Sequence, residues 1–88
     1  MRWAEEARST RATVTADLSA GRRSLDDVLG ARGEEHVGRI KLLVVLEALP
    51  GATKVVTRRR LAELGLEQTT PIGELDEGQL ATVRAAFG

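Results

Sequence analysis

The residues best suited to chemistry in this sequence lie in the stretch LPGATKVVTRRRL, residues 49–61. Gly51 can adopt a left-handed backbone conformation and Ala52 adds little bulk, so this turn can bring its backbone close to another molecule. Lys54 opens a predicted helix, where free backbone N–H groups and the positive end of the helix dipole bind anions such as phosphate. Because a cation is unfavourable at that end of a helix, Lys54 is easier to understand if an anion neutralises it.

The side chains around this turn are unequal candidates for a phosphate contact. Thr53 can either donate its hydroxyl to a phosphate or cap the helix. Lys54 and Arg58 are spaced i, i+4 and therefore lie on one face, which makes them the first candidates. Arg59 and Arg60 follow directly but point in other directions, so they are weaker candidates. A simple connector before a solvated basic helix also explains this stretch, and the residues alone leave both explanations open.

Charge is unevenly distributed along the chain, although 13 basic and 13 acidic residues give a net charge of zero. Residues 36–60 carry six bases and one acid, a net charge of +5, whereas residues 61–88 carry one base and five acids, a net charge of −4. A basic centre can attract a polyanion even in a neutral protein. The acidic part offers an alternative function, binding of a basic protein partner or self-association. Its residues are Glu63, Glu67, Glu74, Asp76 and Glu77.

Catalysis and metal binding have little support in the composition. The 88 residues include one histidine, His36, and no cysteine or tyrosine. No metal-ligand or nucleophile–base spacing accompanies His36, so we expect neither an enzyme nor a cofactor. The longest apolar run, residues 42–46, is too short to span a membrane, and the N-terminus contains acids and no apolar stretch, unlike a secretory signal. We therefore expect a cytoplasmic protein.

The elements that must position the candidates are predicted to be helices. Residues 1–21 are predicted to form an N-terminal helix that is poor in strong helix formers and therefore able to fray and become mobile. Ser24 is a predicted N-cap of a short helix, with Asp27 three residues on. Residues 35–49 are almost entirely apolar around positions 42–46, which predicts a single central helix wrapped by the others.

The C-terminal part is predicted to contain two more helices. One runs from about Lys54 to Leu64, with Thr57, Leu61 and Leu64 facing inward. The other is capped by Asp76, with Gln79 in the capping-box position. The predicted fold class is therefore all-α, a compact bundle of about five helices, with residues 22–88 forming one domain after the N-terminal helix.

Two long stretches of the chain resemble a known family. The run SLDDVLGARGEEHVGRIKLLVVLEALPGATKVVTRRRLAELGL and the closing LDEGQLATVRAAFG resemble the actinobacterial type of integration host factor, over roughly residues 24–88. That family implies an all-helical fold with a helix-two-turns-helix module. It also implies sequence-tolerant binding of double-stranded DNA, with a role in nucleoid organisation or phage integration. By position, the resemblance implies DNA contacts from Gly51, Thr53, Lys54, Arg58, Arg39 and Lys41, with Arg59 and Arg60 as further candidates.

The chain departs from the family pattern in ways that matter for DNA. Thr53 replaces the second glycine of the family's Gly-Val-Gly-Lys turn, and its Cβ would cause strain if the turn needed a positive φ. Val56 stands where the family has arginine, and EQTTPIGELD replaces an arginine-rich loop. We therefore expect weaker and more salt-sensitive DNA binding, or a changed partner such as a related DNA-binding protein. A diverged paralogue and a phage-carried copy both fit.

Overall fold

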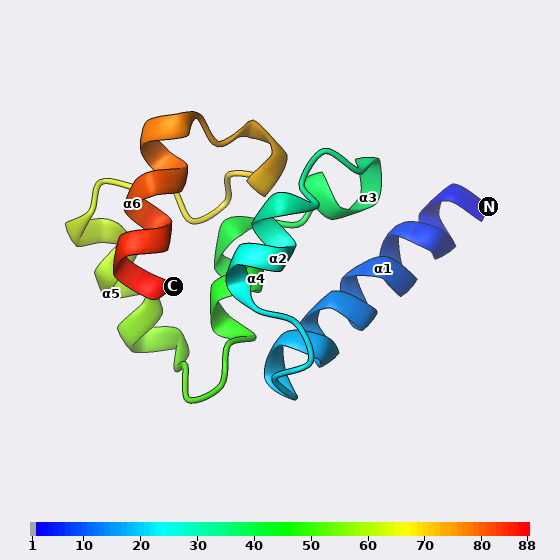
Figure 1. Ribbon diagram of the computed structural model, residues 1–88, viewed down its shortest axis with the longest axis horizontal. Helices are drawn as coiled ribbons and strands as arrows, with labels where there is room; N and C mark the ends of the chain where they lie inside the picture. The colour runs from blue at the N-terminus through cyan, green and yellow to red at the C-terminus, as the bar shows by residue number, and fades with distance from the viewer. Residues whose placement is uncertain (1) are drawn as a thin grey trace.

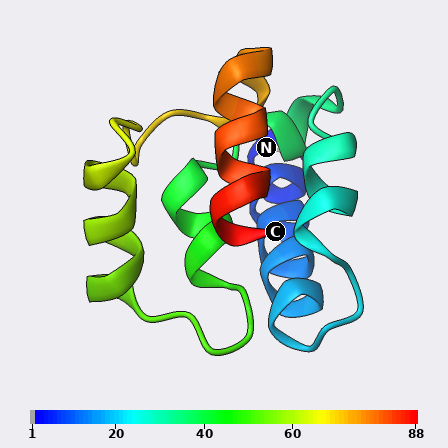
Figure 2. The ribbon, with the colours of Figure 1, turned by 60° about the vertical axis from the view of Figure 1, so that its left-hand side comes forward.

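The computed structural model describes residues 2–88, which fold as a bundle of helices (Figure 1). In chain order these are α1 (Arg2–Ser19), α2 (Leu25–Gly30), α3 (Glu35–Gly38), α4 (Leu42–Glu47), α5 (Lys54–Glu63), the 3-10 helix η1 (Ile72–Glu74) and α6 (Glu77–Phe87). In both views α4 lies in the middle, between α5 on one side and α1 and α2 on the other (Figure 1, Figure 2). The predicted all-α bundle is confirmed.

One core of leucine, valine and isoleucine side chains receives residues from every helix. Val14 and Leu18 of α1 are buried in it, as are the three apolar residues of α2. On α5, Thr57 and Leu61 are buried as predicted, but Leu64 is 39% exposed. The prediction for Leu64 was wrong because this residue is the C-cap of α5, where the chain already turns away from the core.

Two predicted N-caps form complete capping boxes. Ser24 Oγ accepts from the Asp27 backbone N–H at 3.1 Å, and the Asp27 carboxylate accepts from the Ser24 N–H at 3.1 Å. That backbone N–H lowers the pKa of Asp27 below its usual value, so the stabilisation is present at neutral pH and is lost as the pH falls through the lowered pKa. Asp76 and Gln79 make the equivalent pair of hydrogen bonds at the start of α6.

The predicted single helix over residues 35–49 is wrong, because the structure divides it into α3 and α4. The segment that follows α5 crosses the chain between them. The backbone N–H of Leu42 donates to Thr70 O at 2.8 Å, and that of Leu43 donates to Gln68 O at 3.0 Å. In return the Ile72 N–H donates to Ile40 O at 2.9 Å. The first amides of α4 are thus satisfied by a distant segment, which a continuous helix would not allow.

The crossing requires the two backbones to touch. A Cβ placed on Gly73 would lie 3.0 Å from Gly38 O and 3.1 Å from Gly38 Cα, and one on Gly38 would lie 3.5 Å from Gly73 Cα. Arg32 then fastens the crossing segment, since its Nη1 donates to the carbonyls of Leu75 at 2.8 Å, Gly73 at 3.3 Å and Ile72 at 3.4 Å. The position of α4, and of everything that follows it, depends on this contact.

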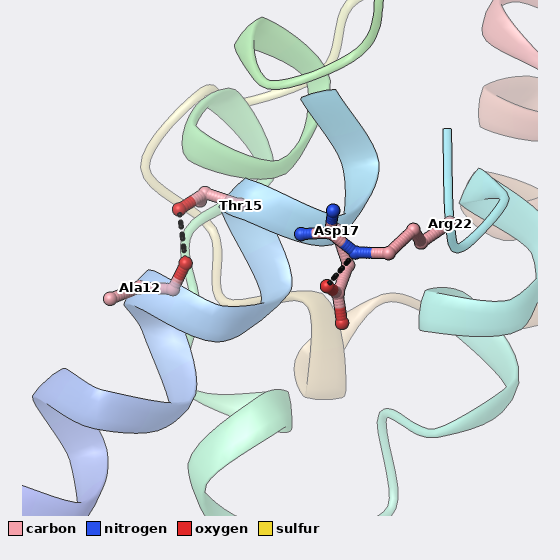
Figure 3. A network of polar contacts seen from close by, with 4 residues as sticks. All are labelled: Ala12, Thr15, Asp17 and Arg22. Carbon is pink, nitrogen blue, oxygen red and sulfur yellow. Dashed lines mark hydrogen bonds and ion pairs between the residues drawn. The ribbon is translucent and has the colours of Figure 1, made fainter. Parts of the chain in front are cut away.

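Helix α1 is continuous through its threonine-rich middle. Thr15 Oγ1 donates to the carbonyl of Arg11 and to that of Ala12, the second of which Figure 3 shows, and the hydroxyl is thus satisfied inside the helix. After α1 ends, Arg22 Nε donates to Asp17 Oδ1 at 2.9 Å (Figure 3). Met1 of the predicted 1–21 segment lies outside the described residues, and the division of the chain into a mobile 1–21 segment and a 22–88 domain stays a prediction.

The crossing can be tested with two glycine-to-alanine substitutions. We expect Gly73→Ala to destabilise the protein by about 1 kcal/mol, or roughly 5 °C in Tm, because its Cβ would lie 3.0 Å from Gly38 O and 3.1 Å from Gly38 Cα across the crossing. The control is Gly30→Ala, where a Cβ meets nothing within 4 Å and the stability should stay equal or rise. Thermal unfolding measures both, and equal melting temperatures for the two variants would contradict the crossing geometry.

Candidate nucleic-acid interface

The turn between α4 and α5 has the geometry that anion binding requires. The Ala52 N–H donates to Leu49 O at 3.0 Å and closes the turn, and Gly51 has the left-handed φ of +79° that its sequence position predicted. Thr53 is extended, with φ −122° and ψ 152°, so the strain expected for a threonine at this position does not arise. Instead, Thr53 Oγ1 accepts from the Val56 N–H at 3.3 Å and caps α5.

Two backbone amides remain available at the start of α5. In the described part of the chain, no hydrogen bond uses the N–H of Lys54 or Val55. Gly51, Thr53 and Lys54 are all exposed, and no carboxylate of the protein accepts from these amides. The turn is therefore neither blocked by an acidic side chain nor sealed inside the bundle, and an anion can approach it from solvent.

The two first-choice cations differ in their surroundings. Lys54 is exposed and forms no ion pair among residues 2–88. Arg58 is half-exposed, and its Nε lies 3.9 Å from Glu47 Oε1 at the end of α4. That carboxylate oxygen is buried and accepts no hydrogen bond, so Arg58 is the cation that compensates it. Glu47 thus holds one side of the Arg58 guanidinium and leaves its remaining N–H donors for a ligand.

The other two arginines of the run lie on different sides of α5. Arg59 is exposed and its side chain has no ion-pair partner within the described residues. Arg60 lies against α6, with its guanidinium carbon 5.0 Å from the centre of the Phe87 ring. A cation–π contact of this kind holds Arg60 next to the C-terminus. Arg60 also lines a hollow together with Gly51 and Thr53 of the turn, whereas Arg58 and Arg59 do not.

Arg39 and Lys41 lie at the start of α4, the opposite end from the 49–53 turn. Two arginines of α1 that the sequence analysis did not identify lie beside them. Arg8 and Arg11 of α1 line the same cleft of about 190 Å³, together with His36. We call the side chains of Arg8, Arg11, Arg39 and Lys41 the basic cleft. The floor between them is apolar, formed by Ala7, Ile40 and Val44. The available signal was the i, i+3 spacing of Arg8 and Arg11 beside the face that buries Val14 and Leu18.

Trp3 holds the first turn of α1 against α3. Its ring centre lies 5.3 Å from that of His36, and its Nε1 donates to Glu35 Oε1 at 3.2 Å. The Arg39 guanidinium carbon lies 4.9 Å from the centre of the Trp3 ring, and Arg39 Nη2 lies 3.6 Å from Glu35 Oε1. On the other side, His36 Nε2 lies 3.5 Å from Glu6 Oε2. Trp3 therefore orients one wall of the basic cleft.

The remaining candidates lie on the surface of the C-terminal part. All five acidic residues proposed for a protein partner are exposed: Glu63, Glu67, Glu74, Asp76 and Glu77. Asp76 is occupied as the N-cap of α6. Within residues 2–88 no group of three potential metal-ligating side chains comes together, and no helix is both long and apolar enough to cross a membrane.

Comparison with known proteins gives concordant results from sequence and structure, although no family model matches the chain. The chain is 32% identical to the integration host factor of Streptomyces coelicolor over 87 residues, covering 97% of this chain and 80% of the relative. It is 33% identical to that of Mycobacterium tuberculosis over 86 residues, covering 97% and 82%. A solved structure of sIHF bound to an 8 bp palindromic DNA is similar over 100% of both chains, with a TM-score of 0.90 and 31% identity.

The contact between α1 and α3 can be tested through the only tryptophan, Trp3. We expect a strong near-UV circular dichroism signal from Trp3, because its ring packs beside that of His36 and its Nε1 donates to Glu35 Oε1. Glu35→Ala removes the acceptor of that hydrogen bond and should weaken the signal, whereas Glu34→Ala, one residue away, is the control. A signal no stronger than that of a free indole in the parent protein would show that α1 does not lie on α3 in solution, as expected of a mobile 1–21 segment.

Proposed function

Since the chain belongs to the actinobacterial integration host factor family, we propose that it binds double-stranded DNA with little sequence preference. The observation that carries this proposal is the pair of unused amides at the start of α5, flanked by Lys54 and Arg58, in a fold similar to that of a protein held on DNA. Backbone amides and helix N-termini bind phosphate oxygens regardless of the base sequence. The proposed contact therefore fixes the duplex without reading it.

At the turn, one phosphate would receive hydrogen bonds from the backbone and from a hydroxyl. The N–H groups of Lys54 and Val55 supply the backbone donors. Thr53 Oγ1 accepts from the Val56 N–H, and its own proton remains free to be donated to a phosphate oxygen. The two roles considered for Thr53, helix cap and phosphate donor, are therefore compatible, and Gly51 keeps the approach free of a side chain.

The cations would then neutralise the neighbouring phosphates. Lys54 and Arg58 lie one helical turn apart, about 6 Å, which is close to the spacing of successive phosphates along a strand. Arg58 is held from below by Glu47, so less side-chain freedom is lost when it binds. We assign a lesser part to Arg59, which is exposed and further round the helix, and to Arg60, which lines the hollow beside the turn but packs on Phe87.

The basic cleft is proposed as a second region of contact with the backbone. It begins at Lys41, the N-cap of α4, whereas the 49–53 turn follows the other end of the same helix. The six residues of α4 separate the two regions by about 9 Å. Arg39 and Lys41 are the residues that the family resemblance implied, and the structure adds Arg8 and Arg11 to them.

This assignment has consequences for where and how the protein works. We propose that it acts in the cytoplasm as a nucleoid-associated protein, with no catalytic role and no cofactor. Val56 stands in place of a family arginine, so one phosphate contact is lost and weaker binding than the family norm stays a prediction. Greater salt sensitivity does not follow, however. Each phosphate contact that is lost makes the slope of log affinity against log salt concentration shallower by about 0.9.

The site at the turn is tested by removing its cations one at a time. We expect Lys54→Ala and Arg58→Ala each to weaken binding to unrelated duplexes about equally, because both contact phosphate and not bases. Each should also reduce the slope of log affinity against log salt by about 0.9. Fluorescence anisotropy of two labelled duplexes of different sequence, titrated at several salt concentrations, measures affinity and slope together.

The matched control is Arg22→Ala, since Arg22 pairs with Asp17 and belongs to neither basic region. Its affinity for both duplexes should stay within about twofold of the parent protein. Unchanged binding in both Lys54→Ala and Arg58→Ala would refute the site. Absence of duplex binding even at low salt, with capture of a basic protein through the acidic surface, would instead favour the alternative partner.

The basic cleft is tested with two substitutions, one at an arginine that the structure indicates and one at an arginine that the family resemblance implies. We expect Arg11→Ala, which only the structure indicates, and Arg39→Ala, which the resemblance implies, to reduce duplex affinity and salt slope by similar amounts. Circular dichroism checks that α1 stays helical in both variants. A loss in Arg39→Ala alone would mean that α1 takes no part in the contact.

A further inference from the structure

Two valines occupy an unusual place at the start of α5. The side chains of Val55 and Val56 are 69% and 54% exposed, the largest exposures among the exposed large hydrophobic residues of the described chain. Single exposed valines are ordinary on a protein surface. These two are adjacent, however, and they directly follow Lys54, at the end of the helix where the unused amides point outward.

Helix stability does not account for this choice of residues. The first turn of a helix favours acidic and small polar side chains, and α1, α2, α3 and α6 each carry an acid there, whereas α4 has buried apolar residues in its first turn. The first turn of α5 reads Lys-Val-Val and has no acid. Valine is also a weaker helix former than most residues because its branched side chain loses freedom in a helix. A residue pair that the helix itself disfavours needs another explanation.

The surroundings indicate what the valines face. Lys54 precedes the pair, and Arg58 and Arg59 lie one turn further along the same helix. Val56 also borders a hollow of about 300 Å³ between the 49–53 turn and α6, whose rim carries Arg60. The pair is thus an apolar area surrounded by cations. A ligand that fits it must be anionic at its edges and apolar between them, and the sugar–phosphate backbone has this alternation.

We propose that Val55 and Val56 pack against the deoxyribose rings on either side of the phosphate that the amides of α5 hold. This inference rests on the proposed function and adds the apolar half of that interface. Contacts with sugars displace water without releasing counterions, so they contribute affinity that does not depend on salt. The valines would therefore add an apolar, salt-independent contribution to the ionic contacts of Lys54 and Arg58.

The same contact favours DNA over RNA. The C2′ position of deoxyribose is a methylene group, whereas ribose carries a hydroxyl that both donates and accepts hydrogen bonds. Burying that hydroxyl against two valines would leave it without a partner, which is unfavourable. The valines therefore select for the deoxy sugar without contacting any base.

The experiment compares salt titrations of the parent protein, Lys54→Ala and the double variant Val55→Ala/Val56→Ala on one duplex. Alanine shortens both side chains, adds no polar group and favours helix. We expect the double variant to bind roughly three- to tenfold more weakly at every salt concentration, with the slope unchanged. Lys54→Ala should instead show a shallower slope, by about 0.9.

The control for lost apolar surface is Leu64→Ala, at the opposite end of α5, which should leave duplex affinity unchanged. If the double variant binds like the parent protein while Lys54→Ala is weakened, the inference is wrong and the proposed function stands. If the parent protein binds no duplex, the proposed function itself fails. A double variant that changes its sedimentation coefficient but not its DNA affinity would show that the valines contact a second copy of the chain, which also overturns the inference.

A second arm measures sugar selectivity with DNA and RNA duplexes of the same sequence. The parent protein should prefer the DNA duplex, and the preference should narrow severalfold in Val55→Ala/Val56→Ala. A 2′-O-methyl RNA duplex keeps the A-form shape but has no hydroxyl donor, so it separates sugar chemistry from helix shape. An unchanged DNA preference in the double variant would show that the valines do not select the sugar.

Discussion

The contact on which the rest of the structure depends is the crossing of residues 68–75 over the chain between α3 and α4. Gly38 and Gly73 allow the two backbones to touch, and Arg32 holds the crossing segment by donating to its carbonyls. The first amides of α4 bond to this segment instead of to a side-chain cap. Because α4 carries the basic cleft at its beginning and the 49–53 turn at its end, one backbone contact sets the relative position of both candidate regions.

Electrostatics is organised locally in a molecule with no net charge. The candidate cations lie on α1, at the two ends of α4 and on α5, and some of them have an acid beside them: Glu35 lies next to Arg39, and Glu47 lies next to Arg58. The buried Oε1 of Glu47 accepts no hydrogen bond, and Arg58 Nε, 3.9 Å away, is the cation that compensates it. Under the proposed function, this contact limits the side-chain freedom that Arg58 loses on binding a phosphate.

The differences from the family pattern change the character of the turn without disrupting it. Thr53 takes an extended conformation and uses its hydroxyl to cap α5, so the missing glycine costs no strain. Val56 presents an exposed apolar side chain where the family resemblance implies a cation. Under the proposed function, both changes keep the backbone amides available while they shift the interface away from purely ionic contacts.

The sequence by itself determined the helical class, the capping boxes of α2 and α6, the left-handed turn at Gly51 and the approximate bounds of α5, because these follow from interactions within a few residues. It failed where distant segments decide the outcome. The break between α3 and α4 exists because residues 68–72 bond to residues 40–43, and Arg60 is held by Phe87 of another helix. The grouping of Arg8 and Arg11 with Arg39 and Lys41 is likewise a matter of how α1 packs on α3 and α4. Local periodicity carries no information about such pairings, so only the tertiary structure could decide which cations share a surface.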